Sequence, residues 1–329
     1  MKKSLIALAV TAAVAVPSIA TADATLYGSF QMGVTDAKNE SLILDDISTR
    51  IGIKGTVDLG LEDTRGIFLW ESAINTNSDG DGLGDLRYAY AGATGAWGTV
   101  LAGKIDHPSV GMVSDYTDFS WNGDYATVGQ EYHSMMTNSL AYASPEFSGL
   151  QFVVGAVFAG DNLSEEKDKT IDGYNLGVQY DANGFYGAVA YGNVKSGKDT
   201  GVYGVDQNVW GLAAGYSGIE NLDLRVSYER LRDKTGGSEV AVDYMDGVEG
   251  KANAWNIAAN YDIDNTSIYG TYGRYKFKPQ NEENAKGTVY TLGVSHAMGN
   301  GAVFAEFVNY GKDIKDEGRY TTVGYILNF

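Results

Sequence analysis

The sequence has no cysteine and only 4 prolines in 329 residues. It also has fewer basic than acidic residues, with 24 Lys and Arg against 42 Asp and Glu. The absence of cysteine excludes disulfide frameworks, thiolate zinc sites and cysteine nucleophiles. The formal net charge of −18 argues against nucleic-acid binding, because that affinity comes from neutralising phosphates with cations. The slightly negative mean hydropathy also argues against a bundle of membrane helices.

The first 22 residues have the layout of an export signal, with two lysines, an apolar run over 5–16, Pro17 and small residues at 20–22. Those 12 apolar residues fall short of the ~20 that a spanning helix needs, and no later segment is longer. We therefore expect a cleaved signal peptide over 1–22 and a single domain over 23–329. Any contact of that domain with a membrane must then come from strands.

Apolar and polar residues alternate with a period of two along the rest of the chain, which is typical of β-strands. The pattern predicts sixteen strands, most of them near the ~9–11 residues that a tilted membrane strand needs. The predicted ranges are 25–34, 47–58, 65–75, 85–93, 97–104, 137–143, 150–159, 172–180, 185–193, 208–216, 221–231, 252–261, 266–275, 287–297, 302–310 and 319–329.

The connections between these strands alternate in length. The odd-numbered connections are long, above all the third over 105–136, and the even-numbered ones are tight, with turn dipeptides such as Asn183-Gly184 and Asn300-Gly301. Bacterial outer-membrane barrels have short periplasmic turns and long external loops, whereas a soluble sandwich has no reason to sort its loops this way. We therefore predict an all-β fold, a closed 16-stranded antiparallel transmembrane β-barrel.

The alternation also predicts which residues share a face. On strand 319–329, Val323, Tyr325 and Leu327 lie on one face, and Thr322 and Asn328 on the other. Periodicity alone does not separate inside from outside, but two aromatic belts favour an apolar outside, as at the two interfaces of a membrane. One belt lies beside the short turns, with Tyr180, Phe185, Tyr216, Tyr261 and Phe329, and the other near the long loops, with Phe158, Tyr191, Tyr228, Tyr275, Tyr310 and Tyr320.

Several segments resemble the general porins of Gram-negative outer membranes. They include Thr25-Leu26-Tyr27-Gly28, residues 49–55, 86–92, 97–104 and 138–149, and the terminal Phe329. The similarity extends in order along the chain after residue 22. It implies a homotrimer of 16-stranded barrels, with the third external loop folded inward as a constriction, and it makes Phe329 an assembly signal for the barrel-assembly machinery.

The third connection is longer than a loop that only joins two strands usually is, and it contains five acidic residues. If it folds into the lumen, these acids face cations that the alternation places on the inner wall, of which Arg50 and Arg87 also match basic wall positions of the porins. Opposed charges in a narrow channel create a transverse field that orients polar solutes. The candidate constriction consists of the acids Asp106, Asp115, Asp118, Asp124 and Glu131 and the cations Arg50, Lys54, Arg87 and Lys104.

The leading hypothesis is a passive channel for ions and small hydrophilic solutes, with no enzyme activity, cofactor or metal. Related porins often carry further cations where this chain has Ser29 and Thr137, so we expect the constriction to prefer cations.

A sugar-specific channel stays open as an alternative, because Tyr116, Phe119, Trp121 and Tyr125 provide aromatic rings in the third connection. An outer-membrane lipid hydrolase is a further alternative and requires a His–Ser pair on the outer wall. His296 lies on a strand, but its neighbour Ser295 points to the opposite face.

Two further features concern ions and lipid. The Asp- and Gly-rich segment 75–85 has the composition of a calcium loop but lacks its terminal Glu. The acids of segments 233–235 and 313–317 are expected at loop crests, where divalent ions can bridge them to lipopolysaccharide. The expected partners are thus two further copies of the chain, lipopolysaccharide and outer-membrane lipid, the assembly machinery and small solutes.

Overall fold

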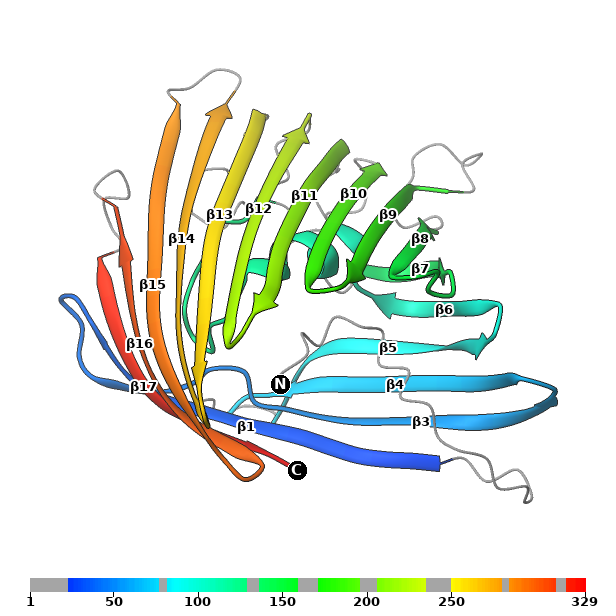
Figure 1. The fold of residues 1–329 in the computed structure, drawn as a ribbon, viewed down its shortest axis with the longest axis horizontal. Coiled ribbons are helices and arrows are strands. Elements are labelled where there is room, and N and C mark those ends of the chain that lie inside the picture. Colours follow the sequence, from blue (N-terminus) through cyan, green and yellow to red (C-terminus); the bar gives the residue numbers. More distant parts are fainter. Residues whose placement is uncertain are drawn as a thin grey trace.

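The computed structural model describes residues 23–76, 82–128, 136–158, 171–195, 206–234, 250–279, 284–311 and 318–329. The expected signal peptide at 1–22 lies outside this part of the chain. The strands form one antiparallel sheet that closes on itself (Figure 1). They are β1 (Asp23–Ala37), β2 (Ile43–Asp46), β3 (Arg50–Leu61), β4 (Thr64–Ile74), β5 (Leu83–Gly95), β6 (Gly98–Ile105), β7 (Met136–Ala143), β8 (Leu150–Val157), β9 (Gly173–Ala182), β10 (Phe185–Lys195), β11 (Asp206–Ile219), β12 (Leu222–Asp233), β13 (Gly250–Ile263), β14 (Thr266–Pro279), β15 (Ala285–Met298), β16 (Gly301–Tyr310) and β17 (Arg319–Asn328).

The barrel has sixteen strands, as predicted, because β2 and β3 are two parts of one strand. Both pair with β1, and they are separated by a break at 47–49, where the backbone N–H of Thr49 donates to Oδ1 of Asp46 at 2.9 Å. The predicted uninterrupted strand 47–58 is wrong at its start for this reason: an Asp side chain takes the place of a neighbouring strand as the hydrogen-bond acceptor.

The barrel closes where the first and last strands meet. Residues 29–37 of β1 pair with β17, and residues 23–29 pair with β3. The seam ends at Phe329, whose backbone N–H donates to the oxygen of Gly28 at 3.1 Å while the N–H of Gly28 donates back at 3.0 Å. Closure leaves no open sheet edge, which a sheet in hydrocarbon requires.

Exposure along the strands confirms the apolar outside. On β12 the side chains of Leu224 and Val226 are 41% and 44% exposed, whereas Arg225, Ser227 and Glu229 between them are 9%, 5% and 1% exposed. A soluble protein shows the reverse arrangement, and an outward apolar face is what lipid requires. Among the residues that the structure describes, no helix is long and apolar enough to cross a membrane.

The tight turns also form as predicted. Asn183 and Gly184 join β9 to β10 with φ angles of 55° and 79°, and Asn221, Asp264 and Gly299 have positive φ in the corresponding turns of the later hairpins. Positive φ at these positions suits the two-residue turns that the twist of paired strands favours. The other end of the barrel therefore carries the long connections.

The aromatic belt near the long loops differs from the prediction. Tyr275 is buried and faces inward, and the hydroxyls of Tyr310 and Tyr320 donate to the third loop inside the barrel. The outward belt contains the predicted Tyr228, which pairs with Trp210, and it adds the ring pairs Trp255–Tyr272 and Tyr290–Phe307. The centroids of the three pairs are 5.3, 5.5 and 6.1 Å apart. The prediction grouped these aromatics by their closeness to the long loops, and closeness alone does not separate the inward from the outward face.

A candidate pore constriction

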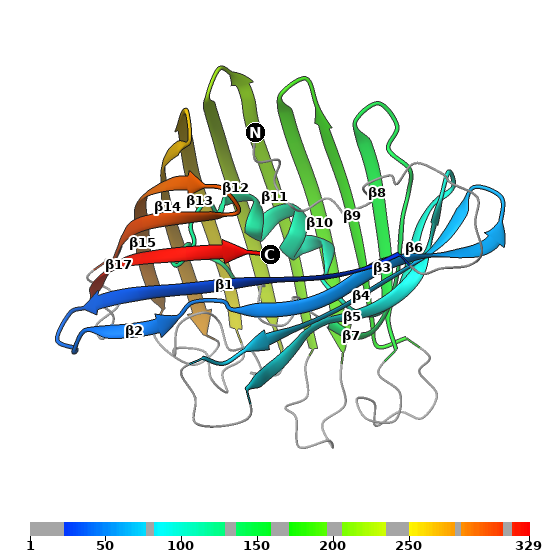
Figure 2. The ribbon, with the colours of Figure 1, turned by 90° about the horizontal axis from the view of Figure 1, so that it is seen from below.

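The third loop runs inside the barrel after β6 and includes two short helical turns, η1 (Val110–Ser114) and η2 (Asp115–Thr117). Figure 2 shows these turns within the ring of strands. Backbone oxygens of the loop accept hydrogen bonds from inward side chains of four strands: Met112 from Tyr186 at 2.9 Å, Tyr116 from Arg225 at 2.8 Å, Thr117 from Thr271 at 3.2 Å and Asp124 from Thr291 at 2.7 Å. The predicted inward fold of this loop is therefore present.

Glycines on the inner wall let the loop approach closely. A Cβ at Gly192 would lie 2.0 Å from Nε2 of His107, and one at Gly215 would lie 1.8 Å from the hydroxyl of Tyr116. Gly177, Gly211 and Gly273 meet other loop residues in the same way. These positions need glycine for space rather than for backbone freedom, and the wall is shaped to receive the loop.

Two buried carboxylates bind the loop to the wall. Glu306 on β16, 2% exposed, accepts the backbone N–H groups of Trp121 at 2.7 Å and Asn122 at 2.8 Å. Glu229 on β12 accepts the hydroxyl of Thr127 at 3.0 Å and that of Ser114. Charge-assisted hydrogen bonds of this kind are about twice as strong as neutral ones, so each glutamate acts as a clamp.

Arg225 fixes the loop by stacking as well as by hydrogen bonding. Its guanidinium lies 4.7 Å from the ring centroid of Tyr116 and 4.0 Å from that of Phe119, and it forms an ion pair with Asp223 at 2.6 Å. Tyr116 stacks in turn on Tyr186 of β10, with centroids 3.9 Å apart. The carboxylate of Asp223 offsets the charge of Arg225. Arg225 therefore holds the loop in place more than it contributes to the electric field across the pore.

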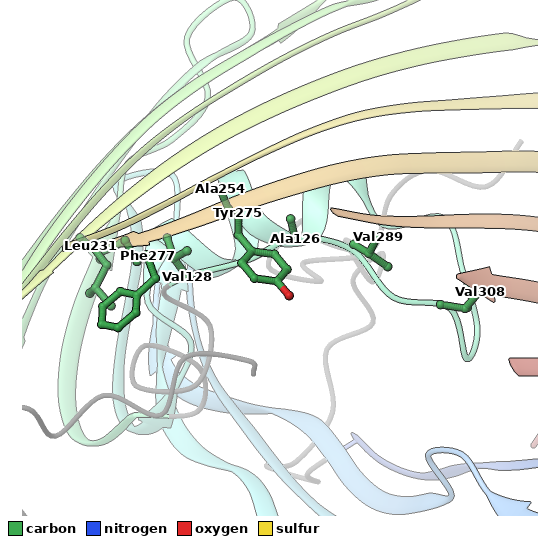
Figure 3. Close-up of a cluster of buried hydrophobic side chains, with 10 residues drawn as sticks. Ala126, Val128, Leu231, Ala254, Tyr275, Phe277, Val289 and Val308 are labelled. Atoms are coloured by element: carbon green, nitrogen blue, oxygen red, sulfur yellow. The ribbon is translucent and has the colours of Figure 1, made fainter. Parts of the chain in front are cut away.

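An apolar cluster supports the end of the described loop, although the alternation predicts a polar inner wall. Figure 3 shows Ala126 and Val128 of the loop among inward side chains of the strands, including Leu231, Tyr275 and Phe277. These strand residues are covered by the loop, so water does not reach this part of the wall. Apolar burial of this kind contributes about 25 cal/mol per Å².

The basic wall lies on β3 and β5, across the ring from β10 to β14 (Figure 1). Arg50 and Arg87 approach one carboxylate, that of Glu71 on β4, at 3.8 Å and 2.7 Å. The hydroxyl of Tyr27 donates to the same carboxylate at 2.7 Å. The structure thus brings the two predicted arginines together, and it adds a buried acid between them that offsets part of their charge.

The two lysines predicted for the basic wall lie on opposite faces of the sheet. Lys54 shares the inward face of Arg50 and lies 4.9 Å from the ring centroid of Tyr27. Lys104 pairs in register with Ala89, which pairs with the exposed, outward Trp70, so Lys104 starts on the outward face, contrary to the prediction. A register irregularity follows it between Gly103 and Ile105, and its ammonium donates to the backbone oxygen of Leu86.

The structure places four of the five predicted acids in the loop inside the barrel, and Glu131 lies outside the described residues. Asp106 accepts the hydroxyl of Tyr88 on β5 at 2.6 Å, next to the basic wall. The other three are half-buried and accept a hydroxyl each: Asp115 from Tyr125 at 3.0 Å, Asp118 from Ser120 at 2.5 Å and Asp124 from Tyr310 at 2.6 Å.

Burial changes the titration of these acids. It raises the pKa of Asp115 to about 7, against the hydrogen bond from Tyr125, and the carboxylates of Asp106 and Asp118 raise it further. It raises the pKa of Asp118 to about 6, against hydrogen bonds within the loop, and it also raises the pKa of Asp124. Desolvation favours the neutral form of a carboxyl, so these groups titrate nearer to neutral pH than a free Asp does.

Sequence reasoning missed Glu71, Glu229, Glu306 and Arg225. Each is a charged residue on the inward face of a strand, where alternation places it, but alternation does not show which inward residues hold the loop. The segment 75–85 is only partly described, because 77–81 lie outside the described residues. Within the described ranges, no three side chains of His, Asp or Glu gather as a metal site.

A sequence profile described as Gram-negative porin matches residues 9–315. The chain belongs to this family. Outer membrane protein U of Vibrio parahaemolyticus is 28% identical to this porin over 308 residues, which cover 85% of this chain and 87% of the relative. Outer membrane protein U of Vibrio cholerae is 30% identical over 259 residues, 68% and 72% of the two chains. With Major outer membrane protein P.IB of Neisseria gonorrhoeae the porin is 29% identical over 209 residues and spans 56% of that relative.

Solved structures share the fold. OmpT of Vibrio cholerae in its trimer form is 15% identical to this porin with a TM-score of 0.71, covering 94% of this chain and 99% of that chain. OmpF of Salmonella typhi gives 20% identity and a TM-score of 0.75 over 93% and 97%. An anion-selective porin from Comamonas acidovorans gives 17% and 0.71 over 94% and 100%. The porin is thus a Gram-negative outer-membrane barrel, and its relatives are channels rather than enzymes.

Proposed function

We propose that this porin is a passive channel for ions and small hydrophilic solutes that prefers cations. The observation that supports the proposal is the third loop, which is fixed inside the barrel and contains Asp106, Asp115, Asp118 and Asp124, whereas Arg50, Lys54 and Arg87 lie on β3 and β5. A passive pore needs no nucleophile, because its selectivity comes from the field at its narrowest section.

The side chains, and not the fold, have to set the sign of the ion preference, since a solved porin of the same fold is anion-selective. In this chain Glu71 offsets part of the charge of Arg50 and Arg87. Lys104 starts on the outward face, and its ammonium donates to the backbone oxygen of Leu86. The acids of the loop thus outweigh the cations that face them, which favours cations in the channel.

Recording in a planar bilayer with a salt gradient tests the proposal. We expect single-channel currents with a zero-current potential of the sign that cation preference gives, because fixed carboxylates repel anions in a confined channel. A zero-current potential of the opposite sign would show that the basic wall dominates. An inserted protein that passes no current would contradict the channel itself.

The cation preference is expected to weaken as the pH falls from about 8 to about 5, because this range crosses the raised pKa values of Asp115 and Asp118. A carboxyl with a raised pKa is ionised above it and neutral below it, so acidification removes negative charge from the loop. The carboxylates facing the pair are Asp106, Asp124, Glu229 and Glu306. The measurement is the zero-current potential at both pH values, and equal values would place the two acids away from the ion path.

The structure favours neither alternative function. A sugar slide needs free aromatic faces, but Tyr116 and Phe119 stack on Arg225, and Tyr125 is buried. A lipid hydrolase needs a His–Ser pair on the outer wall, but Ser295 is buried on the inward face, and His296 hydrogen-bonds Thr266 at 2.9 Å.

We infer a homotrimer, as in the trimer form of the OmpT neighbour. The C-terminal Phe329 supports recognition by the barrel-assembly machinery, since this residue is 51% exposed and its ring lies beside that of Phe30. An assembly factor could therefore reach this ring on the outside of the barrel.

A further inference from the structure

An apolar area lies on the inner wall across the neighbouring strands β4, β5 and β6 (Figure 1), where alternation predicts polar side chains. On β4, Leu69 and Ile67 share the inward face of the buried Glu71 and continue it toward the tight turn. The register extends the area across the sheet, because Leu69 pairs with Tyr90 of β5, and Ile67 pairs with Gly92, which pairs with Leu101 of β6. We call these four large residues, Ile67, Leu69, Tyr90 and Leu101, the luminal apolar strip.

The strip is separate from the apolar residues that the third loop covers. The two buried clusters beneath the loop are built from strands β8 and β10 to β17, whereas the strip lies on β4 to β6. Ile67, Leu69 and Tyr90 are half-buried, and Leu101 is buried. Half-buried apolar side chains on the wall of a wet channel keep part of their surface in water, so a solute with an apolar group gains free energy by covering them.

The dimensions of the strip suit a small apolar group. Neighbouring strands lie about 4.8 Å apart, and successive inward residues of one strand about 6.6 Å apart, so the strip is about 10 Å wide and one such step long. Gly92 adds no side chain between Ile67 and Leu101, and a Cβ there would lie 1.9 Å from the backbone oxygen of Val100. A phenyl ring or a short alkyl chain matches this area.

A lysine lies at the edge of the strip. Lys54 of β3 pairs directly with Leu69, is exposed, and forms no ion pair with a described residue. Other inward charges on the wall are engaged by their neighbours. Asp233, which the sequence suggested for a loop crest, is buried on the inward face and accepts the side-chain amide of Gln207 at 3.0 Å. The ammonium of Lys54 is therefore available to a solute that covers Leu69.

The charges around the strip favour an anion beside it. The nearest inward acid on β4 is Glu71, and its carboxylate is already approached by both arginines of the basic wall, at 3.8 and 2.7 Å. On the other side of the strip, Asp58 pairs directly with Arg65, and Asp23 lies two strands away on β1. Two arginines and Lys54 against one glutamate leave this part of the wall basic, which attracts negative charge.

We propose that the luminal apolar strip and Lys54 form a binding subsite for amphipathic anions, namely carboxylates with a short alkyl or phenyl group. The apolar group covers Ile67 and Leu69, and the carboxylate accepts a charge-assisted hydrogen bond from the ammonium of Lys54. The inference rests on the proposed channel, because the solute reaches the strip through the lumen. It is independent of the proposed preference for cations, which concerns small ions and the acids of the third loop.

Block of the current through the unchanged porin tests the subsite without a variant. In a planar bilayer, sodium butanoate, hexanoate and octanoate are added in turn, and the concentration that halves the current is measured. We expect this concentration to fall roughly two- to fourfold for each added methylene, because each one covers more of the strip. Hexanol and hexylammonium are expected to block more weakly than hexanoate, since neither provides a carboxylate for Lys54.

Two outcomes of this series separate the subsite from the channel itself. A porin that passes no current before any carboxylate is added contradicts the proposed channel. A steady current that all three carboxylates reduce alike, without dependence on chain length, leaves the channel intact and overturns the subsite. Block by hexanol or hexylammonium as strong as that by hexanoate also overturns it.

Variants assign the two parts of the subsite. Ile67→Ser with Leu69→Ser is expected to lose most of the dependence on chain length, and Leu69→Met alone to keep it. Lys54→Gln is expected to raise the half-blocking concentration of hexanoate about threefold or more and to leave that of hexanol unchanged. Lys38→Gln is the matched control, because it removes one exposed cation beyond the long-loop end of β1. Equal effects of Lys54→Gln and Lys38→Gln, or an unchanged chain-length dependence in the double Ser variant, would overturn the proposal.

Discussion

A porin with Glu306→Ala is expected to carry an unsteady current and to unfold more easily. Removal of the carboxylate leaves the backbone N–H groups of Trp121 and Asn122 without their acceptor, and the hydroxyl of Tyr269 loses its acceptor too. The loss of charge-assisted hydrogen bonds in a buried position costs about 2–4 kcal/mol. Without this clamp the tip of the loop can leave the wall and enter the path of the ions.

Single-channel recording and thermal unfolding measure the two effects. Glu306→Gln keeps one acceptor oxygen and is expected to lie between Ala and the unchanged protein. Glu146→Ala is a matched control, because Glu146 is exposed and accepts one backbone N–H, that of Gly149, in a tight turn far along the chain. A steady current in Glu306→Ala would show that the other contacts hold the loop without this clamp.

The double variant Asp115→Asn and Asp118→Asn is expected to lose much of the cation preference and most of its pH dependence. In water, a unit charge about 10 Å from the path of an ion contributes roughly 0.4 kcal/mol. Two carboxylates together then favour cations about fourfold and disfavour anions about fourfold, so the ratio of cation to anion permeability changes by about 16-fold above their pKa values. Below those values the variant and the unchanged porin are expected to converge, because protonation has already removed the charges.

The control for this variant removes two acids outside the constriction. Asp63 and Asp264 occupy tight turns with φ angles of 53° and 50°, and Asn adopts such angles as readily as Asp does. Asp63→Asn with Asp264→Asn therefore changes the net charge equally without disturbing the loop. If both double variants shift the zero-current potential alike, the overall charge of the barrel sets the preference, and the third loop has no special part in it.

Most of the fold could be predicted from the sequence. Period-two alternation and the sorting of short and long connections locate each barrel strand within a few residues, because lipid outside and water inside impose opposite demands on successive side chains. The break at 47–49 and the extra residue at Arg87 could not be predicted in this way. Between β4 and β5, Glu71 pairs with Tyr88 and the next residue, Ser72, pairs with Leu86, so the pairing skips Arg87. Such an irregularity depends on tertiary contacts.

The candidate site was predictable only in outline. The length of the third connection and its acids indicated an inward loop. The position of that loop against the wall, however, depends on contacts between residues far apart in the chain. Glu229 and Glu306 read as ordinary inward acids until the loop is placed on them. The exchange of hydrogen bonds between Asn256 and the backbone of Ala126, at 2.9 and 2.7 Å, joins positions 130 residues apart. A local pattern has no means to pair such distant groups.

The double pairing of β1 has a consequence for biogenesis. Its first half pairs with β3, and its second half pairs with β2 and with β17, the final strand. Translation delivers that partner last, so a nascent chain keeps two unsatisfied edges until nearly the whole polypeptide has left the ribosome. Such edges invite pairing with other chains. Closure of the barrel therefore has to wait for the C-terminal segment.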